Sequence, residues 1–161
     1  MPTSVPGVLR PRASVAALLL LWVVHMPSPA AAQPSPPRAG RVKIVAGAAS
    51  LVRGGQVLPA TPGAEVFESD VLRTGPDGRL SVMFADDSRV SLGPDSELAL
   101  TRFAYAPADA QLGLGLRLAR GALSYVSGLI AKLSPDAVRL QTPTSIIGVR
   151  GTHVLVKADA P

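Results

Sequence analysis

From Val42 onward, short runs of alternating hydrophobic and polar residues are separated by Gly, Pro or Asp. The clearest run covers 79–85, where Leu80, Val82 and Phe84 fall on one face because successive side chains of a strand point to opposite sides. The punctuation recurs about every eight to twelve residues, which is typical of an all-β domain.

Further strands are predicted wherever this alternation returns: 42–46, 49–53, 56–58, 71–74, 88–92, 96–103, 112–118, 122–126, 138–142 and 152–157. Residues 104–111 are expected to form a polar loop, Gly121 to end a strand, and 127–135 to leave room for one helical turn. We expect a compact roll or sandwich of short antiparallel strands with tight Gly/Pro/Asp turns. A solenoid-like stack of strands is the alternative.

The first 32 residues follow a different pattern. Two arginines precede an apolar run over 13–24, and the small residues Ala30-Ala31-Ala32 come shortly after it. These are the three regions of a secretory signal peptide, so residues 1–32 predict a signal-peptide helix cut beside Ala30 and Ala32. An uncleaved anchor is disfavoured because a bilayer span needs roughly 20 apolar residues. We expect a periplasmic protein, with an extracellular location as the alternative.

Three segments are expected after processing: a proline-rich, flexible leader at 33–41, one β domain at 42–157 and a short tail at 158–161. The chain contains no cysteine, which excludes disulfides and thiol chemistry. The apolar core must therefore hold the fold by itself, and no membrane span is expected in the processed chain.

The composition disfavours both an enzyme and a nucleic-acid-binding protein. Basic residues do not cluster along the sequence and aromatics make up 4% of it, so we expect no nucleic-acid partner. His153 is the one histidine after the signal, and no G-x-S-x-G motif is present. Asp86 and Asp87 supply far fewer oxygens than Ca²⁺ requires, and His153 with carboxylates is a poor zinc set. We expect a non-enzyme without metal or cofactor.

Five segments resemble the FecR (ferric-citrate regulator) domain family and occur in the family's order: DVLRTG at 70–75, GRLSVMFADDS at 78–88, LGPDS at 92–96, GALSYVSG at 121–128 and TPTSIIGVRGT at 142–152. The resemblance covers roughly 42–157. The family-motif positions, structural or partner-binding, are Asp70, Thr74, Gly75, Asp86, Asp87, Ser88, Pro94, Gly121, Thr142, Pro143, Gly148, Arg150, Gly151 and Thr152. Two positions depart from the family pattern, because Ser69 and Asp87 stand where glycine is usual.

These motifs favour structural roles. We expect Gly75, Gly78 and Gly93 at turns that need positive φ or a close backbone approach. Asp86, Asp87 and Asp95 are expected to accept hydrogen bonds within their own turns. Arg150 is interpreted first as an internal clamp on Asp70, Asp87 or backbone carbonyls, and second as a fork for an anionic ligand.

The resemblance implies a periplasmic signalling or binding module. In regulator-type members a cytoplasmic anti-sigma segment and a membrane span precede the domain, which senses an outer-membrane receptor; here an export signal stands in their place. We therefore expect a stand-alone adaptor that binds another envelope protein through a strand edge or loop. The alternatives are a structural cell-envelope module and a small-ligand or carbohydrate module, which the sparse aromatics disfavour. The oligomeric state does not follow from the sequence.

Overall fold

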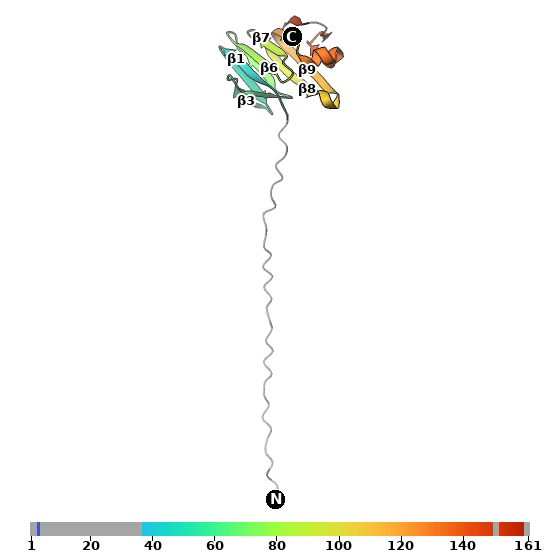
Figure 1. Cartoon of the computed structure of the whole chain (residues 1–161). Helices are drawn as coiled ribbons and strands as arrows, with labels where there is room; N and C mark the ends of the chain where they lie inside the picture. The colour runs from blue at the N-terminus through green and yellow to red at the C-terminus, as the bar shows by residue number, and fades with distance from the viewer. Residues whose placement is uncertain (1–2, 4–36, 150–151, 160–161) are drawn as a thin grey trace. The chain divides into compact units, whose positions relative to one another are not determined.

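The structure, a computed structural model, describes residues 3, 37–149 and 152–159. Twelve strands, one short α-helix and two 3-10 turns occupy most of this part of the chain, so the all-β prediction is confirmed (Figure 1). The expected signal peptide apart from Thr3, the positions Arg150 and Gly151, and the last two residues of the tail lie outside the described residues. Within the described ranges, no helix has the length and apolar character to cross a membrane.

The strands are β1 Arg38–Ala46, β2 Ala49–Arg53, β3 Gln56–Pro59, β4 Glu65–Phe67, β5 Val71–Thr74, β6 Arg79–Phe84, β7 Arg89–Leu92, β8 Glu97–Ala106, β9 Gln111–Val126, β10 Val138–Gln141, β11 Ile146–Gly148 and β12 His153–Ala158. The helix α1 covers Leu129–Leu133, and the 3-10 turns η1 and η2 cover Pro107–Asp109 and Pro135–Ala137. Helix α1 falls inside the stretch 127–135, where one helical turn was expected.

One continuous sheet curls so that its two halves pack against each other. Layer A has the order β4-β1-β6-β7-β9-β12, and layer B has the order β3-β2-β5-β8-β9-β10-β11. Strand β9 belongs to both, because residues 111–120 pair with β8 while 123–126 pair with β7. The pairs are antiparallel, as predicted, except that β10 runs parallel to β9. The solenoid alternative does not describe this arrangement.

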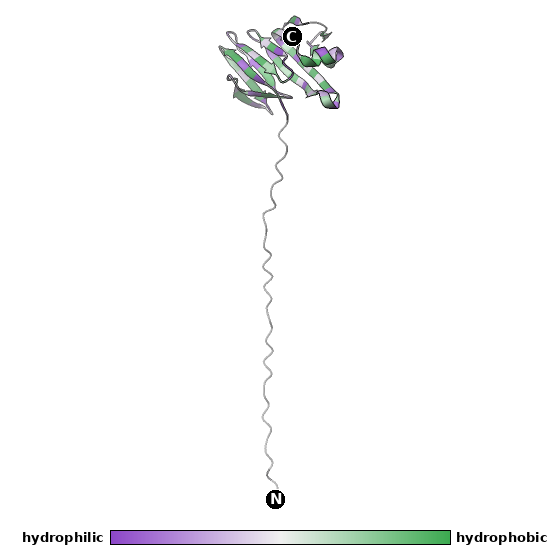
Figure 2. Ribbon diagram, viewed as in Figure 1, coloured by the Kyte–Doolittle hydropathy of each residue, from purple (hydrophilic) through white to green (hydrophobic). Residues whose placement is uncertain are grey.

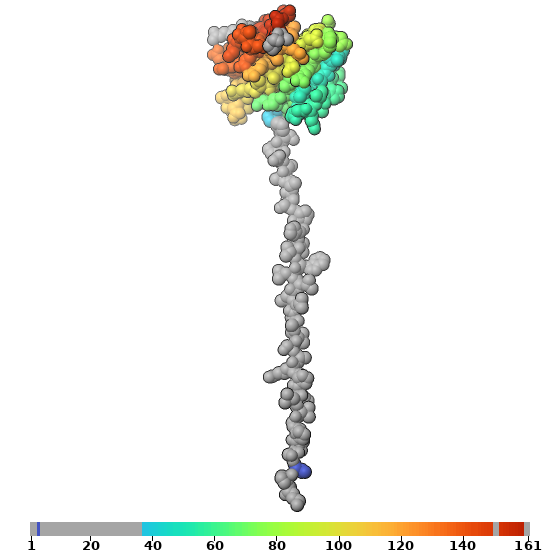
Figure 3. Space-filling view, turned by 180° about the vertical axis from the view of Figure 1, so that it is seen from behind, coloured from blue at the N-terminus to red at the C-terminus, as the bar shows by residue number. Residues whose placement is uncertain are grey.

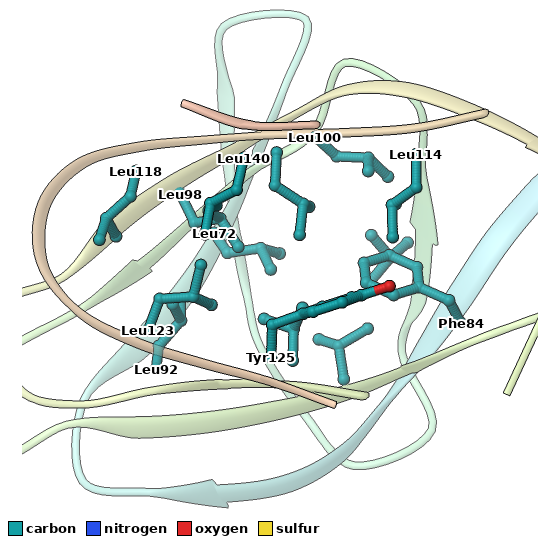
Figure 4. Close-up of a cluster of buried hydrophobic side chains, with 14 of the residues drawn as sticks. Leu72, Phe84, Leu92, Leu98, Leu100, Leu114, Leu118, Leu123, Tyr125 and Leu140 are labelled. Atoms are coloured by element: carbon teal, nitrogen blue, oxygen red, sulfur yellow. The ribbon is translucent and has the colours of Figure 1, made fainter. Parts of the chain in front are cut away.

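Alternating side chains from both layers fill the space between them. Figure 2 shows hydrophobic and hydrophilic residues following one another along the strands. Leu80, Val82 and Phe84 are buried, as their spacing predicted. Figure 4 shows leucines from several strands around Phe84 and Tyr125. Each fully buried side chain of this size contributes about 1.5–3 kcal/mol, so this core can hold the fold without disulfides.

The alternation does not predict the short strands β4 and β11. Three element boundaries also differ from the prediction. Strand β1 begins at Arg38, inside the expected leader, because Gly40 lies against β6, where a Cβ would come within 2.6 Å of the Met83 carbonyl oxygen. Strands β8 and β9 extend into the expected loop 104–111, because Ala110 takes φ 53° and closes a tight turn between them. Strand β12 extends to Ala158, one residue into the expected tail.

Positive φ occurs at both positions where this chain departs from the family's glycines: Ser69 has φ 72° and Asp87 has φ 64°. Of the three glycines expected at demanding turns, Gly78 has the closest approach, since a Cβ there would overlap the Ala48 carbonyl oxygen. A Cβ at Gly75 would lie 3.1 Å from the Ala48 side chain. A Cβ at Gly93 would lie 3.4 Å from the Ala122 side chain, which is an ordinary van der Waals distance. The expectation of a close backbone approach is therefore wrong for Gly93.

Candidate functional site

Asp70 is an internal anchor rather than an exposed site residue. Its side chain is 1% exposed and accepts hydrogen bonds from Arg53 Nε, Arg53 Nη2 and the Phe67 backbone N–H, each at 2.8 Å. The hydrogen bond to Asp70 raises the pKa of Arg53, while partial burial opposes the rise. The guanidinium also lies 4.4 Å from the centre of the Phe67 ring. Arg53 therefore clamps Asp70, whereas the expected clamp Arg150 lies outside the described residues.

Thr74 and Gly75 join the end of β5 to the turn before β8. The Thr74 hydroxyl donates to the Gly93 carbonyl at 2.7 Å and accepts from the Ser96 backbone N–H at 2.9 Å. The Gly75 carbonyl accepts from the Asp95 backbone N–H at 2.9 Å. These bonds hold the turn that contains Pro94.

Ser96 in turn fixes the bend in β9. Its Oγ donates to the Pro94 carbonyl at 3.1 Å and accepts from the Ala122 N–H at 3.0 Å. Beside it, Gly121 has φ 90°, and a Cβ at that position would overlap Ser96. Gly121 therefore bends β9 from layer B into layer A and does not end the strand, contrary to the prediction.

Asp86 is the third internal anchor. It is 0% exposed, and its Oδ1 accepts from Ser88 N at 3.1 Å and Ser88 Oγ at 2.6 Å. Its Oδ2 accepts from Ile130 N at 3.2 Å, and its backbone carbonyl accepts from Leu129 N at 2.7 Å. The turn prediction for Asp86 is confirmed, and the same carboxylate positions the first turn of α1. Asp87, its neighbour, is exposed. No cluster of three potential metal ligands occurs among residues 3, 37–149 and 152–159.

Tyr125 lies beside this anchor with its hydroxyl inside the core, as Figure 4 shows. The residue is 1% exposed, and its hydroxyl has no hydrogen-bond partner in the described part of the chain. Burial raises the pKa of Tyr125 to about 12, and the Asp86 charge adds to the rise. The Ser88 side chain and the Gly128 backbone oppose it, since they lie near the phenol without the geometry of a full hydrogen bond. A buried phenol with this environment strongly disfavours ionisation in the folded state.

This pKa makes the fold sensitive to alkali. Because the folded-state pKa exceeds the ordinary 10.0, the stability from Tyr125 is complete below pH 10 and decreases as pH rises toward 12. The loss reaches about 2–3 kcal/mol. Tyr125→Phe should remove this loss, because phenylalanine has no group to ionise. Urea unfolding of both proteins at pH 8 and pH 11 measures the loss; an equal pH dependence of the two proteins would contradict the assignment.

Strand β12 forms one exposed surface. It pairs with β9 along one side and has no strand on its other side in the described ranges. Leu155 at its centre is 75% exposed. A hollow of about 390 Å³ beside it is lined by β7, β9 and β12, including Ser91, Ser124 and Leu155. Figure 3 shows the C-terminal segment, in red, on the surface of the molecule.

A second surface covers the outer face of layer B. Five exposed arginines lie there: Arg73, Arg102, Arg117, Arg120 and Arg139. Two hollows open among them, of about 620 and 330 Å³, and Gln141 borders both. The turn between β10 and β11 borders the larger hollow with Thr142 and Pro143, which are family-motif residues. The Thr142 N–H donates to the Ser145 carbonyl at 2.9 Å and shapes this turn.

A family model described as FecR protein matches residues 70–161. The chain belongs to the FecR family. The resemblance found in the motifs is thereby confirmed, although residues 42–69 precede the match. No curated protein and no solved structure matches the chain. Membership suggests a signalling or regulatory domain, and FecR is not a known enzyme family.

The motif residues of this FecR domain do not converge on one site. Asp70, Thr74, Asp86 and Ser88 are buried and hold three separate turns, since Asp86 and Ser88 share one. Asp87, Pro94, Pro143, Gly148 and Thr152 are exposed at scattered places. Thr152 contributes a carbonyl that accepts from the Ser127 N–H at 3.0 Å. Most of the described motif residues therefore hold turns of the FecR domain, while Thr142 and Pro143 border the larger hollow on layer B.

His153 contacts Ser124 in the FecR domain, with 2.8 Å between Nε2 and Oγ. Both residues lie on the outer face of layer A, on neighbouring strands. In the described part of the chain no carboxylate bonds to the imidazole, so a Ser-His-Asp arrangement does not form there. The pair is an exposed hydrogen bond between strands.

The arginines of layer B were missed because they are far apart in the sequence. Arg73, Arg117 and Arg139 each stand next to a core leucine or valine, so alternation places these three outward. Their gathering depends on the pairing of β8, β9 and β10, and a single sequence does not show which strands become neighbours.

Proposed function

We propose that this FecR domain is an exported, non-enzymatic adaptor that binds another protein of the bacterial envelope by adding one of that protein's strands to β12. The observation that carries the proposal is the open edge of β12 with Leu155 exposed at its centre. An unpaired edge offers a row of backbone donors and acceptors to an incoming strand. Apolar exposure at such an edge is usually avoided in proteins that bind nothing there.

The other edges of the sheet are less suited to this role. Strands β4 and β11 have 3 residues each, and β3 has 4 and ends at Pro59. Strand β12 has 6 residues, with half-buried Val154 and Val156 pointing inward. Its outward Leu155 borders the hollow shared with β7 and β9, which can receive one side chain of an added strand.

Export rests on the N-terminal sequence. The positive flank, the apolar run over 13–24 and the small residues Ala30 and Ala32 support secretion with cleavage. A chain without cysteine needs no oxidation after export, since its core alone stabilises it. The periplasm is the compartment in which such a domain would meet envelope proteins.

The test compares capture by the wild-type chain, Leu155→Glu and Val57→Glu, each expressed at full length with an affinity tag. Val57 is 67% exposed on β3, at a different edge, so it is the matched control. We expect wild type and Val57→Glu to retain one stoichiometric periplasmic protein and Leu155→Glu to weaken its binding about tenfold, or about 1.4 kcal/mol. Hydrogen exchange should show new protection in β12 of the complex.

Three results would count against this proposal. Equal capture by Leu155→Glu and Val57→Glu would remove β12 from the interface. Co-sedimentation with cell-wall sacculi without a protein partner would favour a structural envelope module. An intact mass that retains residues 1–32 would show that the signal is not cleaved.

A further inference from the structure

The outer face of layer B is strongly basic. Its five arginines come from β5, β8, β9 and β10, and no lysine is found in the described residues of these strands. Glu97 lies 3.3 Å from Arg73 and 3.7 Å from Arg120. Asp136 is the second acid at this face, at the border of the smaller hollow. A third acid, Glu68, accepts from the Phe103 N–H at 2.7 Å, beside Arg102. Five arginines against three acids leave an excess of positive charge, and we call this surface the arginine face.

Strand register arranges the arginine face in three rows across the sheet: Arg73, Glu97 and Arg120; then Ala99, Arg117 and Gln141; then Arg102, Gly115 and Arg139. On a strand, neighbouring rows lie two or three residues apart, which corresponds to about 7–10 Å. Arg102, Arg117 and Arg139 form no ion pair with any described residue. Arg117 instead donates to the Gln141 side-chain oxygen at 3.2–3.3 Å.

The surface between the arginines, which we call the floor of the arginine face, is formed mainly by small residues. Gly113 and Gly115 of β9 face outward with Ala99 and Ala119, and the side chains of Thr101 and Arg102 lie over the two glycines. Arg102 lies across Gly113, where a Cβ would come within 2.6 Å of Nε. Such a Cβ would displace the guanidinium, so the glycine allows Arg102 to lie along the sheet. The hollows of about 620 and 330 Å³ give room for an extended chain above this floor.

The chemistry of the face favours carboxylates on an extended peptide. Arginine presents a planar fork of N–H donors that matches a carboxylate with two parallel bonds. In an extended peptide every second side chain points the same way, with a repeat of about 6.6–7 Å, which is close to the row spacing. The three rows contain no aromatic side chain on which sugars or bases could stack.

We propose that the arginine face binds an extended acidic segment of a protein, with Asp or Glu at alternate positions. Arg117 and the pair Arg102 and Arg139 receive the carboxylates, because Glu97 already engages the first row. This surface is separate from the β12 edge, and its binding does not depend on the adaptor function.

The probe is a fluorescent peptide Ser-Glu-Ser-Glu-Ser-Glu-Ser, compared with Ser-Ser-Glu-Glu-Glu-Ser-Ser of the same composition. Anisotropy titrations at low and physiological salt measure binding to the full chain. We expect the alternating peptide to bind about tenfold more tightly, and Arg117→Gln or Arg139→Gln to weaken it about tenfold each, since hydrogen bonds to charged groups are lost. Arg89→Gln is the matched control, because Arg89 is an exposed arginine of layer A.

Several results would overturn the proposal. Equal binding of the two peptides, or equal weakening by Arg89→Gln, would indicate general charge attraction. Tighter binding to a sulfated polysaccharide, single-stranded DNA or phosphatidylglycerol vesicles would assign the face to another class of partner. Leu155→Glu, which alters only the β12 edge, should leave peptide binding unchanged. The peptide titrations therefore test the arginine face separately from the β12 proposal. Melting temperatures of all variants should stay near that of the wild type.

Discussion

Gly128→Ala is expected to lower the free energy of unfolding by about 3 kcal/mol or more, because backbone atoms fill the space where the new Cβ would stand. That Cβ would overlap the Asp86 carbonyl oxygen and the Ser88 backbone nitrogen, and would lie 2.8 Å from the Asp87 carbonyl carbon. These atoms cannot rotate away as a side chain could. Equilibrium unfolding in urea measures the loss.

Gly148→Ala is the matched control for this substitution. Among the described residues, no atom lies within 4 Å of a Cβ built at Gly148, and neither glycine has positive φ. The control should change the free energy of unfolding by less than about 0.5 kcal/mol, as surface substitutions usually do. If Gly128→Ala changed the free energy of unfolding as little as Gly148→Ala does, the turn at Asp86 would be able to move away from Gly128 at no cost in stability.

Asp86→Ala should destabilise the fold by about 3–4 kcal/mol, because it leaves buried donors without an acceptor. The Ser88 N–H, the Ser88 hydroxyl and the Ile130 N–H all donate to this carboxylate. Asp86→Asn keeps one acceptor oxygen and should lose less. Thermal unfolding followed by circular dichroism provides the measurement.

The neighbouring Asp87 gives the control for Asp86. Asp87→Asn removes a charge at an exposed position whose φ of 64° asparagine tolerates, so the melting temperature should hardly move. A loss equal to that of Asp86→Ala would mean that net charge, rather than the buried hydrogen bonds, holds this turn.

Most strands could be predicted from the sequence because they bury one face, whereas β4 and β11, with 3 residues each, are too short to show an alternation. Leu80, Val82 and Phe84, and likewise Leu114, Leu116 and Leu118, alternate with polar or small residues and are buried. Turn residues were recognisable by type, since Asp87 takes the positive φ at the place where the family has glycine. Local rules of this kind act within a few residues and need no knowledge of the fold.

Features that depend on distant residues could not be predicted. Gly121 looks like the end of a strand, and only the partners β7, β8 and β12 on its two sides turn it into a bend. Arg53 lies 17 residues from Asp70, and nothing in the sequence distinguishes it from the other arginines as the clamp. The same holds for the arginine face, which exists only once β8, β9 and β10 lie side by side.

The membership of β9 in both layers has a mechanical consequence. Its first ten residues carry Arg117 and Arg120, and its last six support the whole of β12. The two proposed binding surfaces thus share one continuous backbone no longer than about 50 Å at the rise of an extended strand. A ligand with both a free strand and an acidic stretch would meet them at a nearly constant separation. Once one end had attached, the local concentration of the other would rise, and avidity would exceed either contact alone.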